Sequence, residues 1–364
     1  MTSPDTRITV AVVYGGASPE HSVSCISAGA VMAHLDRARY DVVPVGITRD
    51  GTWVAGVDDP EALSAHGREL PEVDENAQEL ALSAAPSRRG ELHRIGGERA
   101  GELFATVDVV FPVVHGPNGE DGTIQGLLDL SGIPYIGPGV LASAAGMDKE
   151  ATKALAKAAG IPIGDQVVLH EGESLTEEEI ARLGFPMFVK PARGGSSIGI
   201  SKVDGPETLD AAIALAREHD YKVIVEAGIV GDEVECGVLQ LPDGSVTTSV
   251  PSRLLGIEES EEGFYGFDTK YLDDVITAEI PAQLADGMTE RVRELAVRTF
   301  RALSCDGLAR VDFFVTPDGP VLNEINTMPG FTPISMYPQM FGKTGVGYAE
   351  LLDTLVRRGL AARR

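Results

Sequence analysis

The strongest constraint on the fold is a pair of alternating segments near the C-terminus that can pair as one β-hairpin. Residues 309–315 and 320–326 flank Thr-Pro-Asp-Gly, and Pro-Asp-Gly between two such segments predicts a tight turn. Because side chains alternate across a strand, the polar residues of both segments are expected to share one face. If residues 317–319 form the loop, these polar residues pair across the hairpin: Asp312 with Glu324, and Arg310 with Asn326.

The two faces of this hairpin are expected to differ in chemistry. One face carries apolar side chains, with Asn323 as an exception: Val311, Phe313, Val315, Val321 and Ile325. The other face combines two carboxylates with a carboxamide, an all-oxygen ligand set that suits Mg²⁺. Arg310 beside them can hold phosphate oxygens through charge-assisted hydrogen bonds. This face predicts a metal and phosphate site, and the alternative is a solvated Arg–Asp pair on a surface hairpin.

Strand-like and helix-like segments alternate over the first 145 residues. The predicted strands are 8–14, 40–47, 107–114 and 134–136, and the predicted helices are 22–35 and 124–130. This alternation indicates a doubly wound parallel sheet. Glycine-rich turns follow the first and third strands, at the strand ends where such sheets bind ligands. Residues 56–104 interrupt the pattern and are expected to form an elaborated connection that can hold short strands.

The remaining residues mix helices and strands without strict alternation. The predicted elements are helices at 148–162, 207–219 and 285–303, with strands at 165–169, 186–190 and 222–226. Together with the hairpin and a last helix, they indicate two further lobes. The expected fold class is therefore α/β and α+β, with domains at 1–145, 146–226 and 227–364.

Composition excludes several classes of protein. The 364 residues include 55 acidic and 30 basic side chains, and a net charge of −25 argues against nucleic acid as a partner. The sequence has no run of 18 apolar residues, the length that a membrane-spanning helix needs, and the N-terminus has no signal-peptide hydrophobic region. The isolated cysteines Cys25, Cys236 and Cys305 suit buried thiols in a reducing cytoplasm better than disulfides or a zinc site.

Two lysines are candidates for binding phosphate. Lys190 closes an apolar strand, and Lys149 stands at the start of a helix. The loop 193–199 lacks the spacing of a P-loop, but its backbone N–H groups could fold over phosphates as a flap. The alternatives are solvated surface lysines and a flexible linker.

Several segments together resemble the D-alanine–D-alanine ligases of the ATP-grasp superfamily. They run in the family's order from residue 8 to about residue 340. The segments are GGASPEHSVS at 15–24, HGPNGEDGTIQG at 115–126, MDK at 147–149, VKP at 189–191, GSSIG at 195–199, KY at 270–271, RVD at 310–312 and NEINTMPGFT at 323–332. Each is moderately specific alone, whereas their joint occurrence is highly specific.

The resemblance implies a three-lobed ATP-grasp fold. It also implies an enzyme that uses ATP to join two D-alanine molecules through a D-alanyl phosphate, releasing ADP and phosphate. The dipeptide is a precursor of peptidoglycan. The residues implied for two Mg²⁺ or Mn²⁺ ions are Asp312, Glu324 and Asn326. The residues implied for ATP are Lys149, Lys190, Ser196, Ser197, Glu226, Ala227, Ile229, Glu233 and Lys270.

The resemblance also implies two D-alanine subsites and a homodimer. The residues are Glu20 and His115 for the first D-alanine, Ser335 and the Met336 N–H for the carboxylate of the second, and Arg310 with the Gly330 N–H for the oxyanion. Tyr271 lies at the end of a segment that resembles the family's ω-loop. It would close over the second subsite, linked to Ser196 and Glu20.

Other functions remain as alternatives at this point. A D-alanine–D-lactate ligase is the nearest, and Tyr271 argues against it because relatives that use D-lactate lack this tyrosine. An ATP-grasp ligase acting on bicarbonate or a peptide is disfavoured by Glu20 and by the region around Ser335. A nucleotide-binding regulator without activity is disfavoured by the intact set of polar residues on the hairpin.

Overall fold

The N-terminal part of the chain forms a mainly parallel sheet in the strand order β3-β2-β1-β7. The computed structural model describes residues 7–65, 67, 69–256 and 277–362. The elements are β1 (Ile8–Gly15), α1 (His21–His34), β2 (Tyr40–Ile47), β3 (Trp53–Ala55), β7 (Val109–Pro112), α2 (Thr123–Ser131) and α3 (Val140–Met147). Strands β2 and β7 both pair in parallel with β1, and β3 adds an antiparallel edge. The predicted parallel sheet is confirmed, although 134–136 contributes only a single parallel bridge, from Tyr135 to Val110.

The predicted connection at 56–104 contains its own small sheet. Its elements are η1 (Glu61–Leu63), β4 (Leu80–Leu82), η2 (Pro86–Arg88), β5 (Glu91–Arg94) and β6 (Leu103–Thr106), with the strands in the antiparallel order β4-β5-β6. Leu80 and Leu92 are buried in one apolar cluster with residues of β1, β2 and β7. The insertion therefore covers one side of the N-terminal sheet.

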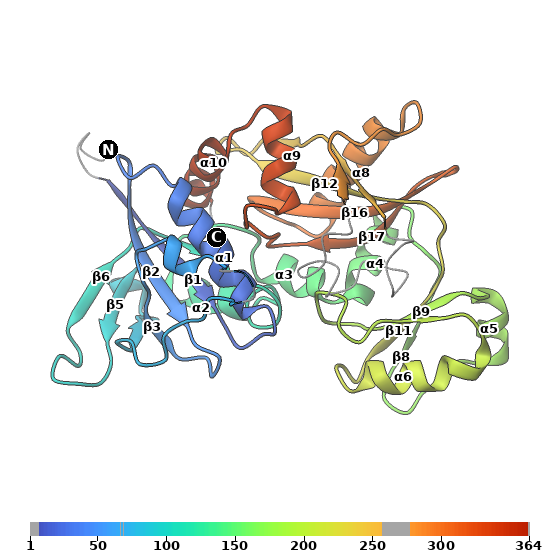
Figure 1. The fold of residues 1–364 in the computed structure, drawn as a ribbon, viewed down its shortest axis with the longest axis horizontal. Coiled ribbons are helices and arrows are strands. Elements are labelled where there is room, and N and C mark those ends of the chain that lie inside the picture. The colour runs from blue at the N-terminus through green and yellow to red at the C-terminus, as the bar shows by residue number, and fades with distance from the viewer. Residues whose placement is uncertain (1–6, 66, 68, 257–276, 363–364) are drawn as a thin grey trace.

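The central part of the chain is an antiparallel sheet in the order β10-β9-β11-β8. Its elements are α4 (Lys149–Ala158), β8 (Gln166–Leu169), α5 (Glu177–Leu183), β9 (Met187–Pro191), β10 (Ser201–Val203), η3 (Pro206–Thr208), α6 (Leu209–Arg217) and β11 (Val223–Ala227). Apolar residues of α5 and α6 pack on this sheet in one cluster. Figure 1 shows it in green and yellow as a lobe apart from the N-terminal sheet, in blue.

The C-terminal part is a larger antiparallel sheet in the order β15-β14-β12-β16-β17, with β13 paired to β12. Its elements are β12 (Asp232–Gln240), β13 (Val246–Thr248), β14 (Ser252–Leu255), β15 (Thr277–Glu279), α8 (Met288–Ala302), β16 (Leu308–Thr316), β17 (Gly319–Asn326), α9 (Met336–Thr344) and α10 (Tyr348–Ala361). Helix α8 packs against the apolar side of β16 and β17. The opposite side of the same strands is left for polar residues.

The predicted pairs of the C-terminal hairpin are confirmed, but the predicted loop is wrong. Arg310 pairs with Asn326 and Asp312 with Glu324, while Thr316 pairs with Gly319 and leaves a turn of only two residues. A β-bulge opposite Asp312 and Phe313 restores the predicted register, because one extra residue on β17 shifts the alternation by one position. Beyond the bulge the residue opposite Phe313 is Leu322, which is buried, whereas the predicted loop would have placed Asn323 there.

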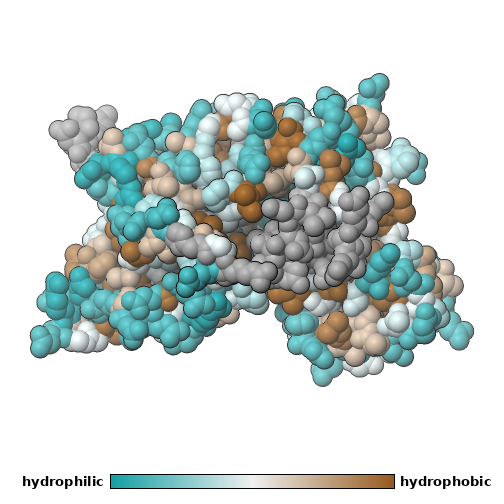
Figure 2. Space-filling model, in the orientation of Figure 1, coloured by the Kyte–Doolittle hydropathy of each residue, from teal (hydrophilic) through white to brown (hydrophobic). Residues whose placement is uncertain are grey.

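The last helix, α10, packs against the N-terminal part of the chain. Leu351, Leu355 and Val356 of α10 are buried in the same apolar cluster as Val12 of β1 and Val31 of α1. The N-terminal and C-terminal sheets therefore share a core, which fixes one against the other (Figure 1). Figure 2 shows mostly hydrophilic residues on one face of the molecule, with scattered apolar ones. No helix among the described residues is long and apolar enough to cross a membrane.

Candidate active site

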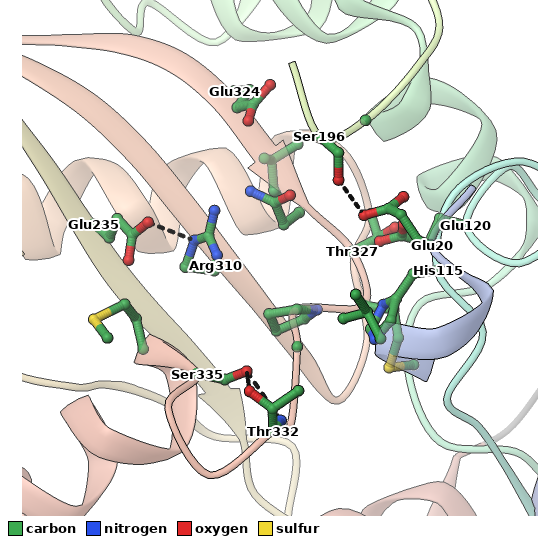
Figure 3. Close-up of a pocket in the computed structure, with 18 of the residues that line it drawn as sticks. Glu20, His115, Glu120, Ser196, Glu235, Arg310, Glu324, Thr327, Thr332 and Ser335 are labelled. Atoms are coloured by element: carbon green, nitrogen blue, oxygen red, sulfur yellow. Dashed lines mark hydrogen bonds and ion pairs between the residues drawn. The ribbon is translucent and has the colours of Figure 1, made fainter. Parts of the chain in front are cut away.

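A cavity of about 660 Å³ lies where the three lobes meet. It is lined by the turn after β1, the turn after β7, the start of α4, the loop after β9, the polar face of β16 and β17, and the loop before α9. Figure 3 shows Glu20, Glu120 and His115 on one side of this space and Arg310 with Glu235 on the other. Ten residues predicted for the site line it: Glu20, His115, Lys149, Ser196, Arg310, Glu324, Asn326, Gly330, Ser335 and Met336.

The hairpin face holds an ion pair between Arg310 and Asp312. Arg310 Nε donates to Asp312 Oδ1 at 2.8 Å and Nη2 donates to Oδ2 at 2.7 Å. Asn326 Nδ2 also donates to Asp312 Oδ2, at 3.0 Å. Burial would lower the pKa of the Arg310 guanidinium, but Asp312 and Glu235 hold this pKa well above its usual value. The predicted cluster is therefore assembled, with Arg310 fully charged inside it.

Lys149 connects this face to the loop after β9. Asp148 caps helix α4 by accepting a hydrogen bond from the Ala151 N–H at 3.2 Å, which fixes Lys149 in the first turn. Lys149 Nζ donates to the Gly194 carbonyl at 2.9 Å and lies 3.8 Å from Glu324 Oε2. Its ammonium group therefore lies between the predicted flap and the predicted metal ligands.

The predicted flap reaches across the cavity to the N-terminal lobe. Ser196 Oγ donates a hydrogen bond to Glu20 Oε1 at 2.5 Å, as Figure 3 shows. Ser196 and Ser197 have φ angles of 51° and 58°, in a left-handed region that is uncommon for residues other than glycine. Ser196 and Glu20, both predicted to link to Tyr271, are bonded to each other, while Tyr271 and Lys270 lie outside the described residues.

A second charged cluster lies deeper in the central lobe. Glu226 accepts from Lys153 Nζ at 2.5 Å and forms an ion pair with Lys190. Burial alone would raise the pKa of the Glu226 carboxyl, but the two lysines lower it to about 2. Lys190 was predicted to face phosphates, and its ammonium group is here paired with Glu226. The sequence did not single out Lys153, whose side chain is only 2% exposed.

Three other residues predicted for ATP, Ala227, Ile229 and Glu233, do not line the cavity. The Ala227 N–H donates a hydrogen bond to the Asp165 carbonyl at 3.0 Å. Ile229 lies against Gly164, where an added Cβ would come within 2.9 Å of its side chain. Glu233 is the second residue of β12, in the C-terminal sheet, and lies opposite Phe314.

The N-terminal corner of the cavity holds two carboxylates and a histidine. Glu120, which the sequence analysis did not single out, accepts from the Gly116 N–H at 2.6 Å. Burial, and to a smaller degree the neighbouring Glu20, raise the pKa of the Glu120 carboxyl to about 8. Burial also lowers the pKa of His115, with Glu20 opposing the change. His115 Nε2 lies 3.2 Å from Ser27 Oγ. Glu120 was visible in the sequence only as part of the glycine-rich turn.

We expect Glu120→Gln to change how stability depends on pH. The ordinary pKa of glutamate is 4.5 and the folded value is about 8, so the folded state holds the proton more tightly. The wild type therefore loses free energy of unfolding as the pH rises from 4.5 to 8. Glutamine resembles the protonated acid, so the variant should gain about 1–3 kcal/mol relative to the wild type between pH 5 and pH 8.5. Denaturant unfolding at several pH values measures this, and parallel curves would contradict it.

The loop before α9 forms the last wall of the cavity. Thr332 N–H donates to Ser335 Oγ at 3.0 Å, and the two hydroxyl oxygens lie 2.8 Å apart. Ser335 is the N-cap of α9 and Met336 is its first residue, so their backbone N–H groups lie at a helix start. A Cβ on Gly330 would come within 2.7 Å of Ser335 Oγ, so a larger residue here would displace the Ser335 hydroxyl.

The polar face of the hairpin fits a divalent cation in its ligand chemistry. The described residues contain no ready-made group of three His, Cys, Asp or Glu side chains that could hold a metal ion. The predicted set differs from such a group because its third member is the amide of Asn326. Asp312 and Glu324 are directly opposite each other, so their oxygens suit a hard cation when phosphate supplies the other ligands. A bound cation would compete with Arg310 and Asn326 for the oxygens of Asp312.

Comparisons with known proteins agree on one family. The description "D-ala D-ala ligase N-terminus" matches residues 9–138 and "D-ala D-ala ligase C-terminus" matches residues 155–357. A D-alanine–D-alanine ligase from Corynebacterium efficiens is 62% identical over 358 residues, which cover 98% of each chain.

Solved structures show the same similarity. The VanG D-Ala:D-Ser ligase from Enterococcus faecalis is 38% identical with a TM-score of 0.83, covering 98% of this chain and 100% of that one. The D-alanine–D-alanine ligase from Coxiella burnetii is 32% identical with a TM-score of 0.82, covering 97% and 94%.

Proposed function

Since this chain belongs to the D-alanine–D-alanine ligase family, whose members are ATP-dependent ligases, we propose that the cavity phosphorylates one D-alanine and joins it to a second. The products are D-alanyl-D-alanine, ADP and phosphate, and the dipeptide serves peptidoglycan synthesis. The carboxylate of the first D-alanine attacks the γ-phosphate. The amine of the second then displaces phosphate from the D-alanyl phosphate. Such phosphoryl transfer depends mainly on positioning and on cationic groups.

The roles of the cavity residues follow from their charges and positions. Glu20 binds the ammonium group of the first D-alanine, beside His115. Arg310 and the Gly330 N–H stabilise the oxyanion formed when the amine attacks. Ser335 and the Met336 N–H bind the carboxylate of the second D-alanine, which suits a helix start.

The nucleotide lies between the central and C-terminal sheets in this proposal. Lys149 and Lys190 hold its phosphates, and Ser196 and Ser197 cover them. The adenine is bound by Glu226, Ala227 and Ile229, and Glu233 accepts hydrogen bonds from the ribose hydroxyls. Lys270 is a further nucleotide-binding residue in this proposal. Closure of the loop excludes water, which would otherwise hydrolyse the D-alanyl phosphate.

Asp312, Glu324 and Asn326 would hold two Mg²⁺ or Mn²⁺ ions together with the nucleotide phosphates. When bound, these ions neutralise the charge that develops on the transferred phosphoryl group. Arg310 and Lys149 would add positive charge on either side. Asp312 and Glu324 keep the side chains of Arg310 and Lys149 oriented before the nucleotide binds.

One observation carries this proposal: groups from all three lobes converge on a single cavity, with Glu20, Ser196 and Arg310 among them. The test is ADP release and product identification by mass spectrometry, with D-alanine and with L-alanine as the only amino acid. We expect D-alanyl-D-alanine and equimolar ADP with D-alanine alone. ADP release that does not depend on D-alanine would contradict the proposal.

Tyr271→Phe is expected to move the choice of second substrate toward a hydroxy acid. The tyrosine hydroxyl would link to Ser196 and Glu20, and loss of one such hydrogen bond corresponds to about a 10-fold change. The ratio of dipeptide to depsipeptide, measured with D-alanine and D-lactate from pH 6 to pH 9, should fall most at low pH. D-Serine belongs in the same assay, because VanG by its name uses it. An unchanged ratio would argue against the role of Tyr271.

The organisation of the protein around this reaction also remains a proposal. The domains 1–145, 146–226 and 227–364 each contain one main sheet, and the cavity lies among them. A homodimer is supported by the family resemblance and is measured by light scattering. A cytoplasmic location is supported by the three free, buried cysteines.

A further inference from the structure

The polar face of the C-terminal sheet contains a third carboxylate beside the two that were predicted. Glu235 of β12 pairs with Asp312 of β16, which in turn pairs with Glu324 of β17. The three acidic side chains therefore form one row across three adjacent strands. Glu235 is only 4% exposed and lines the cavity.

Glu235 contacts the guanidinium group of Arg310 on the side away from β17. Its Oε1 lies 3.4 Å from Arg310 Nε, as Figure 3 shows. Its other oxygen accepts a hydrogen bond from Ser252 Oγ at 3.5 Å. Arg310 thus lies between two carboxylates, with Asp312 close and bidentate and Glu235 farther away.

Asp312, unlike Glu235, is also a predicted metal ligand. Asp312 Oδ1 accepts one hydrogen bond, from Arg310, and Oδ2 accepts two, from Arg310 and Asn326. A cation held by Asp312 and Glu324 competes with Arg310 for these oxygens and weakens the Arg310–Asp312 pair. A largely buried guanidinium that loses its carboxylate partner is costly, by several kcal/mol if nothing replaces it.

We propose that Glu235 is a positioning residue that keeps Arg310 in place when a divalent cation takes up Asp312. This inference rests on the proposed metal role of Asp312 and Glu324. In the metal-free protein Arg310 binds mainly Asp312. In the metal-bound protein Glu235 becomes its carboxylate partner, so the guanidinium stays directed into the cavity rather than following Asp312.

The inference makes a prediction about metal affinity as well as turnover. Glu235→Gln removes the second carboxylate, so Arg310 should hold Asp312 more tightly and compete with the cation. Changes to residues that orient metal ligands cost about 10- to 100-fold in affinity or activity. We therefore expect the Kd of Mn²⁺, measured by electron paramagnetic resonance with a non-hydrolysable ATP analogue, to rise about 10-fold. The kcat at saturating Mg²⁺ should fall by about 10-fold or more.

A double-mutant cycle separates positioning from direct ligation. If Glu235 acts through Arg310, Glu235→Gln should have little effect on Mn²⁺ affinity once Arg310→Met is present. If Glu235 were itself a ligand, the 10-fold loss would persist in that background and overturn the proposal. Equal Mn²⁺ affinity for wild type and Glu235→Gln would also overturn it. Asp232→Asn, on the exposed end of the same strand, is the matched control and should leave affinity unchanged.

Two further measurements keep the outcome clear. Circular dichroism and thermal unfolding check that Glu235→Gln folds. If it does not fold, Glu235→Asp, which keeps the charge on a shorter side chain, replaces it in the double-mutant cycle. Glu235→Asp should raise the Kd of Mn²⁺ by about 3-fold. Wild-type protein that ligates D-alanine and binds Mn²⁺, with an unaffected Glu235→Gln, would refute this inference alone. Wild type that binds no Mn²⁺ with nucleotide would refute the proposed metal role and this inference together.

Discussion

Glu324→Ala is expected to reduce turnover by about 10³-fold or more while the protein remains folded. The substitution removes one of two carboxylates that face each other across β16 and β17. The remaining carboxylate, Asp312, is bound to Arg310, so a cation would lose its most accessible oxygen ligand. The side chain of Glu324 is 32% exposed, so its removal should change the free energy of unfolding by about 1 kcal/mol or less.

Steady-state kinetics across a Mg²⁺ titration measure this effect. Glu324→Gln keeps an oxygen but loses the charge, and it should lie between wild type and alanine. Asp318→Ala changes an exposed carboxylate in the turn of the same hairpin and should behave as wild type. Turnover near the wild-type value in Glu324→Ala would refute the assignment of the metal site.

Glu226→Ala should destabilise the protein by about 3–5 kcal/mol, because it leaves two buried ammonium groups without their carboxylate. The side chains of Lys153 and Lys190 are only 2% and 9% exposed, and both are paired with Glu226. Chemical denaturation gives the free energy of unfolding directly. The exposed pair of Lys202 and Asp204 is the control, and Asp204→Ala should cost about 0.5 kcal/mol or less.

The same cluster should make the wild type sensitive to acid. The pKa of Glu226 falls from 4.5 to about 2 on folding, so its contribution to stability is fully present above pH 4.5. That contribution is lost as the pH falls from 4.5 through 2. The difference between wild type and Glu226→Ala should therefore shrink in this range. A difference that stays constant down to pH 2 would argue against the ionised cluster.

Local sequence patterns predicted most of the elements and the polar face of the hairpin, because these depend on neighbouring residues. Glu20, Ser335 and Met336 were assigned to the cavity only by the family resemblance. The alternation in the hairpin placed Arg310 opposite Asn326 correctly even though the loop length was wrong. The error was cancelled by a bulge on β17, which depends on how Leu322 packs in the core and leaves no clear mark in the sequence.

Contacts between distant segments were beyond the reach of these patterns. Lys153 looks like an exposed helix residue in the sequence, and only the tertiary fold brings it within hydrogen-bond distance of Glu226 on β11. Glu235 looks like one of many acidic residues until the pairing of β12 with β16 sets it beside Arg310. Glu120 is remarkable neither in type nor in spacing, and its raised pKa depends on burial near Glu20.

The most direct test of the whole account is a crystal structure with a non-hydrolysable ATP analogue and Mn²⁺, using the anomalous scattering of the metal. We predict Mn²⁺ peaks about 2.1 Å from oxygens of Asp312, Glu324 and Asn326, with the phosphates between these residues and Lys149. Bound nucleotide with the Mn²⁺ peaks elsewhere, and an undisturbed Arg310–Asp312 pair, would contradict it.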